Sequence, residues 1–321
     1  MERREEAVVT GHRRVRARRA IAAAVVALLA LAGCGGAAPS ASGDRDVPTV
    51  LTTFTVLQDI AQNVAGEHLE IESITKIGAE IHGYEPTPRD VAKASEADLI
   101  LDNGLHLEAW FAQFVDSAEV PHAVVSEGIE VLDITGDAYA GTPNPHAWMS
   151  PQNVEIYVDN MVAAFSDLDP EHAQEYADNA AEYQRELRAI QNDLIAEIET
   201  LPETERALVT CEGAFSYLAR DVGLEEHYLW PVNAEQQATP QQIAGVIETV
   251  RAQGIPAVFC ESTVSDKPMR QVVEATDARF GGTLYVDSLS EADGPVPTYL
   301  ELLRHDADVI VTGLTGEQAA A

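Results

Sequence analysis

Apolar residues follow two alternating patterns along most of the chain. Short runs rich in β-branched and aromatic residues, typical of strands, precede longer blocks in which apolar residues recur every three or four positions, as in helices. In the first half these segments are residues 49–54, 56–66, 69–75, 87–97, 98–104 and 122–128. Such alternation predicts a parallel sheet covered by helices. Thr87-Pro88 followed by Asp90 predicts a capped helix start.

The same alternation returns after residue 204. The segments there are residues 206–213, 214–223, 225–231, 239–254, 255–261, 265–281, 283–290 and 298–314. Their order again favours parallel strands connected by helices. They predict a second α/β lobe.

Residues 169–202 separate the two halves and carry an unbroken helical pattern. Their apolar positions lie three or four residues apart and are Tyr176, Ala180, Tyr183, Leu187, Ile190, Leu194 and Ile198. Asp169-Pro170 predicts the start of this amphipathic helix and Pro202 its end. We therefore predict an α/β fold with two α/β lobes of mostly parallel sheets, residues 48–168 and 204–321, joined by one long rigid helix in residues 169–203.

The N-terminus has the composition of an export signal. Seven arginines lie within the first 19 residues, and the apolar run 20–33 is shorter than the roughly 20 residues needed to cross a bilayer. Leu31-Ala32-Gly33-Cys34 resembles the cleavage box of bacterial lipoproteins, in which the cysteine becomes the lipidated first residue. This resemblance implies a signal peptide in residues 1–33, lipidation of Cys34 and a flexible tether in residues 34–47. An uncleaved anchor with an unmodified cysteine is the alternative.

Acidic residues far outnumber basic ones. The chain has 53 acidic and 20 basic side chains, a formal net charge of −33. Removal of residues 1–33 takes away 3 acidic and 7 basic side chains and leaves a net charge of −37. Such a surface repels nucleic acid and favours solubility. Lipidation of Cys34 would leave two cysteines, Cys211 and Cys260, in an exported, oxidising compartment.

Polar residues that follow the predicted strands are candidate ligands, because open α/β sheets bind ligands beyond the carboxyl ends of their strands. These residues are Glu212, Glu261 and Asp287, and they are joined by His82 and His146 from loops rich in Gly and Pro. Imidazoles and carboxylates together suit a divalent first-row metal. Each residue alone also fits a hydrogen-bonded surface role or a helix cap. The other histidines show no matching carboxylate setting, and we predict surface or packing roles for His68, His106, His122, His172, His227 and His305.

Five motifs together carry a family resemblance. HGYEPTP, NPHAWMSP, CEGAFSYLARDVG, FCESTVSDK and LYVDSLS have the order and separation seen in cluster A-I metal-binding lipoproteins of ABC importers. More narrowly, the Cys-Glu-Gly and Phe-Cys-Glu-Ser-Thr patterns resemble the manganese-binding branch known from cyanobacteria. The resemblance implies that one divalent ion in the cleft between the lobes is bound by His82, His146, Glu212 and Asp287. Many relatives read Asp-Pro-His where this chain has Glu80-Ile81-His82, a difference that concerns the geometry of the loop.

The resemblance also implies partners and a location. Family members deliver their ion to a membrane permease that works with a cytoplasmic ATPase. We therefore expect an extracytoplasmic protein held at the outer face of the cell membrane by lipidated Cys34. We expect it to be a monomer and a binding protein, not an enzyme.

Cys211 and Cys260 both stand at the ends of predicted strands in the same lobe. Neighbouring parallel strands lie ~4.8 Å apart, which is within the Cα separation of a disulfide. A bond between them would close a loop of about 50 residues, contribute on the order of 4 kcal/mol and fix the backbone that carries Glu212. It would also remove two thiolate ligands and leave a site of nitrogen and oxygen donors. Two buried free cysteines are the alternative.

We predict Mn²⁺ as the bound ion, with Zn²⁺ and Fe²⁺ as alternatives, and Glu261 as a supporting residue outside the ligand set. Carboxylates that bind through two oxygens raise the coordination number to about five or six, which Mn²⁺ tolerates better than tetrahedral Zn²⁺. Two other function classes are a secreted metal-dependent hydrolase with Glu261 as base, and a surface adhesin. Four ligands argue against the hydrolase, because a catalytic metal keeps an open position.

Overall fold

The computed structural model describes residues 47–111, 120–136, 139–232 and 238–316. The predicted signal peptide, Cys34 and the tether up to residue 46 lie outside the described residues. Residues Val47–Ala321 belong to one compact unit. Within the described ranges, no helix combines the length and the apolar character needed to cross a membrane.

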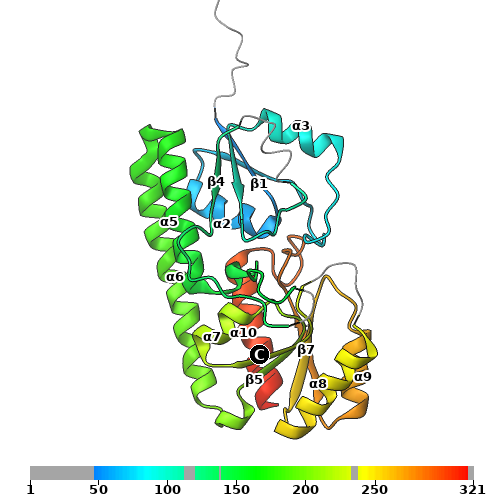
Figure 1. Ribbon diagram of the computed structural model, residues 1–321. Helices are drawn as coiled ribbons and strands as arrows, with labels where there is room; N and C mark the ends of the chain where they lie inside the picture. Colours follow the sequence, from blue (N-terminus) through cyan, green and yellow to red (C-terminus); the bar gives the residue numbers. More distant parts are fainter. Residues whose placement is uncertain (1–46, 112–119, 137–138, 233–237, 317–321) are drawn as a thin grey trace, which may run out of the picture. The chain divides into compact units, whose positions relative to one another are not determined.

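The N-terminal half is built on a four-stranded parallel sheet (Figure 1). Its strands occur in the order β2-β1-β3-β4, and the register pairs Val50 of β1 with Ile71 on one side and Leu99 on the other. Strand β1 is buried along its whole length, as its apolar run predicts. The elements are β1 (Thr49–Thr52), α2 (Thr55–Ala65), β2 (Glu70–Ser73), α3 (Pro88–Glu96), β3 (Leu99–Asp102) and β4 (His122–Val124).

The predicted cap of α3 is confirmed. The Thr87 side chain accepts a hydrogen bond from the Asp90 backbone N–H, and the Asp90 carboxylate accepts one from the Thr87 N–H, with Pro88 in the first turn. This reciprocal cap satisfies two backbone donors that the helix cannot pair internally. It fixes the end of the loop that begins after β2 and carries His82.

Two long helices connect the halves. They are α5 (Pro151–Leu168) and α6 (Ala173–Glu199), with the short helices η2 (Ala147–Met149) before α5 and η3 (Pro170–His172) between them. All seven apolar positions predicted for the connecting helix are buried on α6. Helix α6 begins three residues later than Pro170, because η3 occupies the intervening residues; the Asp169 carboxylate there binds the Tyr176 hydroxyl and the His172 ring.

The C-terminal half contains two parallel strand pairs, β5 with β6 and β7 with β8. Strands β5 and β7 lie beside each other, and the predicted disulfide between Cys211 and Cys260 is confirmed, with the two Cα atoms 4.9 Å apart. The elements are η4 (Glu203–Glu205), β5 (Ala207–Glu212), α7 (Ser216–Val222), β6 (Glu225–Trp230), α8 (Pro240–Gln253), β7 (Ala257–Glu261), α9 (Lys267–Ala275), β8 (Arg279–Leu284) and α10 (Tyr299–Thr315).

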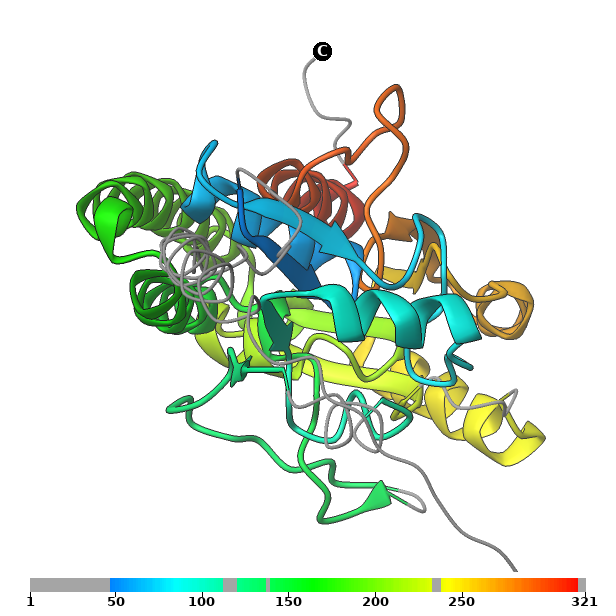
Figure 2. The same ribbon diagram turned by 90° about the horizontal axis from the view of Figure 1, so that it is seen from above.

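Helix α6 packs against elements of both halves. It contacts α2 from the N-terminal half, α7 and α10 from the C-terminal half, and α5 along its side. Helices α5 and α6 run together along one edge in Figure 1, and Figure 2 places α8 and α9 at the opposite edge. The predicted fold class, an α/β protein with parallel sheets and a long connecting helix, is therefore confirmed. The exact domain boundaries stay a prediction.

Truncation of a buried residue of α6 should destabilise the whole unit. Leu187 is fully buried in the core shared by α2, α5 and α10, so we expect Leu187→Ala to lower the free energy of unfolding by about 2–5 kcal/mol. Arg185→Ala, at an exposed position of the same helix, should change it by less than about 0.5 kcal/mol. Urea denaturation followed by circular dichroism measures both values. Equal midpoints for the two variants would contradict the assigned role of α6.

Candidate metal centre

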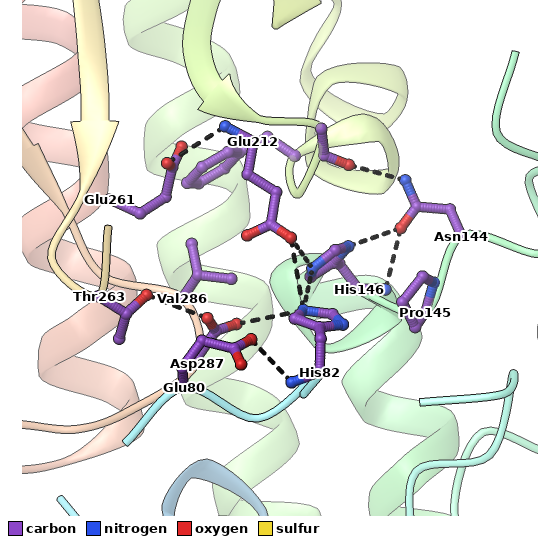
Figure 3. A network of polar contacts seen from close by, with 12 residues as sticks. Glu80, His82, Asn144, Pro145, His146, Glu212, Glu261, Thr263, Val286 and Asp287 are labelled. Carbon is purple, nitrogen blue, oxygen red and sulfur yellow. Dashed lines mark hydrogen bonds and ion pairs between the residues drawn. The ribbon is translucent and has the colours of Figure 1, made fainter. Parts of the chain in front are cut away.

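The four side chains predicted as ligands converge in the structure (Figure 3). One donor atom from each of His82, His146, Glu212 and Asp287 lies within 4.8 Å of the others. The His82 side chain is 5% exposed, and those of the other three residues are fully buried. Two imidazoles and two carboxylates from distant parts of the sequence therefore share one enclosed site.

The separations between these donor atoms match those around a single ion. The Nε2 atoms of His82 and His146 are 3.0 Å apart, and each lies 3.4 Å from Glu212 Oε1. His82 Nε2 lies 3.7 Å from Asp287 Oδ1. Donors bound at ~2.1 Å to a central ion are roughly 3.0–3.5 Å from one another. The side chains are thus placed to bind an ion with small adjustments.

The positions of the carboxylates follow from the sheet. Glu212 is the last residue of β5, Glu261 is the last residue of β7, and Asp287 follows β8. Parallel strands bring their carboxyl ends to one edge, where ligands of open sheets bind. His146 directly precedes η2, and His82 lies in the loop between β2 and α3.

The charges at the site differ between its two histidines. Burial lowers the pKa of His82, but the carboxylates of Glu212 and Asp287 outweigh it and raise this pKa to about 9. Burial, with the neighbouring His82 charge, holds the pKa of His146 well below its usual range. Burial alone would raise the pKa of Asp287. The hydrogen bond and the charge of His82 outweigh burial, so the pKa of Asp287 lies below its usual value. Without a metal, the proton on His82 supplies the positive charge that these carboxylates attract.

Asn144 orients His146 and ties it to the neighbourhood of Glu212. Its Oδ1 atom accepts hydrogen bonds from the His146 backbone N–H at 3.0 Å and from the ring Nδ1 at 2.8 Å. Its Nδ2 atom donates to the Gly213 carbonyl at 2.8 Å and to Ser216 Oγ at 3.1 Å. The proton on Nδ1 leaves the lone pair of Nε2, on the side of His82 and Glu212, as the one that could bind an ion. The sequence analysis missed this residue, although its place two positions before His146 was the available signal.

Trp148 makes the corresponding link to Asp287. Its indole N–H donates to the carbonyl of Val286 at 3.0 Å, one residue before Asp287. The hydroxyl of Tyr299 donates to the Trp148 carbonyl. The short segment around His146 is therefore fastened to the backbone next to both acidic ligand candidates.

The loop that carries His82 is shaped by two contacts. The Glu80 carboxylate accepts hydrogen bonds from the backbone N–H groups of His82 at 2.8 Å and Gly83 at 3.0 Å. The indole of Trp110 donates to the Ile81 carbonyl at 3.0 Å. Glu80 thus holds the turn in the position where many relatives have Asp-Pro.

Glu261 lies behind Glu212 and outside the group of four. Its Oε2 atom accepts a hydrogen bond from the Glu212 backbone N–H at 3.2 Å. Burial and the charge of Glu212 raise the pKa of Glu261 well above its usual range. Cys211 and Cys260 also lie close to Glu261, but their sulfurs are joined in the disulfide and offer no thiolate to a metal.

A family model and several known proteins match the chain. Residues 50–313 match the family model described as ZnuA, zinc-uptake complex component A, periplasmic. The chain is 54% identical over 265 residues to the iron-binding protein YfeA of Yersinia pestis, covering 82% of this chain and 85% of that protein. It is 34% identical over 287 residues to the manganese ABC transporter substrate-binding lipoprotein PsaA of Streptococcus mitis, covering 85% and 93%.

Solved structures agree with these matches. The manganese-bound periplasmic metal-binding protein of Candidatus Liberibacter asiaticus superposes with a TM-score of 0.78 at 40% identity, covering 83% of this chain and 99% of that one. The periplasmic zinc-binding protein TroA of Treponema pallidum superposes with a TM-score of 0.77 at 26% identity, covering 84% and 99%. The relatives share one fold and differ in the metal that they are named for.

Removal of the Asn144 side chain should weaken metal binding. We expect Asn144→Ala to lower the affinity for a divalent ion about 10- to 100-fold, because His146 loses the hydrogen bonds that orient its ring. Asn160→Ala is the matched control, since Asn160 also donates to two carbonyls, those of Val125 and Glu127, but away from the site. Calorimetric titration checks both variants. Equal losses of affinity would contradict the orienting role of Asn144.

Proposed function

We propose a function on the premise that the chain belongs to the family of metal-binding substrate-binding proteins of ABC transporters. Members of this family work with a membrane permease and its ATPase, and they are binding proteins, not enzymes. This membership excludes the secreted hydrolase considered from the sequence. The narrower likeness to the cyanobacterial branch stays a prediction.

The proposed function is capture of one divalent ion, Mn²⁺, by His82, His146, Glu212 and Asp287. The observation that carries it is the convergence of these four buried donor side chains within 4.8 Å. Two imidazoles and two carboxylates form a nitrogen and oxygen donor set without thiolates, which suits ions harder than Cu⁺. A carboxylate that binds through both oxygens would raise the coordination number above four, which favours Mn²⁺ over tetrahedral Zn²⁺.

Iron is a second candidate, because the relative from Yersinia pestis that is 54% identical is named an iron-binding protein. Fe²⁺ accepts the same donors and lies beside Mn²⁺ in the affinity order of divalent metals. Zn²⁺ remains a competitor, since it binds most nitrogen and oxygen sites more tightly than either ion. Selection of Mn²⁺ therefore depends on coordination number and on the supply of ions outside the cell.

We also propose how the captured ion is used. The protein is held by lipidated Cys34 at the outer face of the cell membrane, acts as a monomer and passes its ion to the permease. The lipoprotein name of the Streptococcus mitis relative and the cleavage box before Cys34 support the anchor. A flexible tether in residues 34–47 would allow the metal-binding part of the chain to move away from the membrane surface and toward the permease.

A titration with Mn²⁺ tests the capture site. We expect metal-free protein with its disulfide intact to remove the six-line electron paramagnetic resonance signal of the aqueous ion up to one equivalent. Glu212→Gln keeps the shape of the side chain but removes its charge and one of its oxygens. It should lower the affinity at least about 100-fold, since loss of supporting contacts alone costs 10- to 100-fold.

Glu203→Gln is the control for general charge attraction. Glu203 is exposed on η4, which precedes the start of β5, and its replacement removes the same charge at the opposite end of this strand from Glu212. Its Mn²⁺ titration should equal that of the unaltered protein. An undiminished free-ion signal in the unaltered protein would refute the manganese proposal, and repetition with Fe²⁺ and Zn²⁺ by calorimetry would identify the ion.

Metal binding should release a proton from His82. The pKa of this imidazole is raised to about 9, so the ring is protonated at neutral pH and must lose its proton before Nε2 binds an ion. His146 has a lowered pKa and is already neutral. Affinity should therefore rise about tenfold per pH unit from pH 6 to 8 and level off near 9, above the histidine value of about 6.5 expected from the sequence.

Calorimetry in buffers of different ionisation enthalpy measures the number of protons released. We expect about one proton per ion at pH 7. His305→Gln removes a half-buried histidine on α10, outside the group of four, and should leave this number unchanged. Release of no proton would argue against His82 as a ligand.

A further inference from the structure

A second group of metal-binding side chains lies where α2 leads to β2 and α6 begins. One donor atom from each of His68, His172 and Glu175 lies within 4.8 Å of the others. The side chains are 26%, 32% and 61% exposed, so solvent ions reach them. None of these residues belongs to the capture site, and the sequence analysis assigned both histidines to surface or packing roles.

The contacts of His172 prepare one of its nitrogens for a metal. Its Nδ1 atom lies 2.6 Å from Asp169 Oδ2, and this oxygen also accepts a hydrogen bond from the Tyr176 hydroxyl at 2.8 Å. A carboxylate on one ring nitrogen fixes the tautomer and raises the basicity of the other nitrogen, as in many metal sites. Asp169 therefore leaves Nε2 of His172 as the available donor.

His68 and Glu175 provide the remaining donors. His68 Nε2 lies 2.6 Å from Glu175 Oε2, although the residues are 107 positions apart. The Asn179 side chain donates to the Val64 carbonyl at 3.2 Å and so fastens the end of α2 to α6 close to this pair. This hydrogen bond holds α2 against α6, and so keeps His68 close to His172 and Glu175 without using their side chains.

The two imidazole rings are stacked. Their centroids are 3.7 Å apart, and their planes differ by 15°. The nitrogen lone pairs lie in the ring planes, which are nearly parallel, so the rings must tilt toward each other before both nitrogens point at one ion. Both side chains are partly exposed, which leaves them room to rotate.

We propose that His68, His172 and Glu175 form a second divalent-metal site on the surface, with Asp169 as the residue that positions His172. Two imidazoles and one carboxylate favour Zn²⁺ or Cu²⁺ over Mn²⁺. Three protein ligands leave the other coordination positions to water, so this site binds more weakly than the enclosed group of four. The strong negative charge of the chain raises the local concentration of such cations.

A zinc titration of metal-free protein, followed by calorimetry, tests this site. We expect a tight phase from the capture site and a second, weaker phase from the surface site. The double variant His68→Gln/His172→Gln should lose the weaker phase and keep the tight one. Mn²⁺ should show the tight phase alone, because its affinity for imidazole donors is lower.

His227→Gln is the matched control. His227 Nε2 lies 3.2 Å from Glu225 Oε1, a histidine–carboxylate pair that belongs to none of the three donor groups found in the described part of the chain. Its replacement should leave both phases intact. Asp169→Asn should weaken the second phase about 10- to 100-fold while the tight phase stays unchanged, which a purely structural role would not produce.

The two proposals fail in distinguishable ways. Glu212→Gln should remove the tight phase and retain the weaker one. A weaker phase that persists in the double variant, or is absent from the unaltered protein, would overturn the surface site. If the double variant also lost the tight phase or its thermal stability, the single variant His68→Gln would decide, because it leaves the contacts of Asp169 with His172 and Tyr176 in place.

Discussion

The carboxylates of Glu212 and Asp287 are fully buried against two imidazoles, and the surrounding structure is arranged around this contact. Buried charge is costly unless it is paired, so such a group persists only where a partner of opposite charge is close. In the metal-free state the proton of His82 supplies one positive charge, and its raised pKa reflects this attraction. A divalent ion brings two positive charges to the same oxygens. The buried negative charge of these two carboxylates therefore both destabilises the metal-free site and attracts a cation to it.

Hydrogen bonds and the disulfide join the segments that carry the candidate ligands, and so hold these buried side chains together. Asn144 and Trp148, on either side of His146, bind the carbonyls of Gly213 and Val286, which adjoin Glu212 and Asp287. The disulfide joins β5 and β7 one residue before Glu212 and Glu261. Because these links act on backbone next to the candidate ligands, they limit movement of those residues without using their donor atoms. Such support is how outer contacts tune a metal site.

The sequence predicted the parts of this arrangement that depend on periodicity and chain direction. Strand ends gave the positions of Glu212, Glu261 and Asp287, and apolar spacing gave the buried face of α6. The links through Asn144 and Glu80 were missed, because a side chain that pairs with a backbone group leaves no periodic pattern, and the remaining signal was their place two positions before His146 and His82. The pairing of His68 with Glu175 was missed for a related reason. These residues are 107 positions apart and meet only because α6 packs against α2.

The burial of the site determines which part must move when an ion enters. With side-chain exposures of 5% or less, an ion cannot reach the four donors unless at least one segment is displaced. His146, Glu212 and Asp287 are held together through Asn144 and Trp148, whereas the His82 loop is braced mainly by its own half, through Glu80 and Trp110. Its links across the site are the contacts of the His82 ring with Glu212 and Asp287 and one hydrogen bond from the Gly78 N–H to Ser288 Oγ at 2.7 Å. Displacement of the loop breaks this hydrogen bond, worth about 1 kcal/mol, together with the His82 contacts, whereas the other segments are joined to one another by several hydrogen bonds. We therefore expect the His82 loop to be displaced when an ion enters, while His146, Glu212 and Asp287, the other three candidate ligands, keep their arrangement.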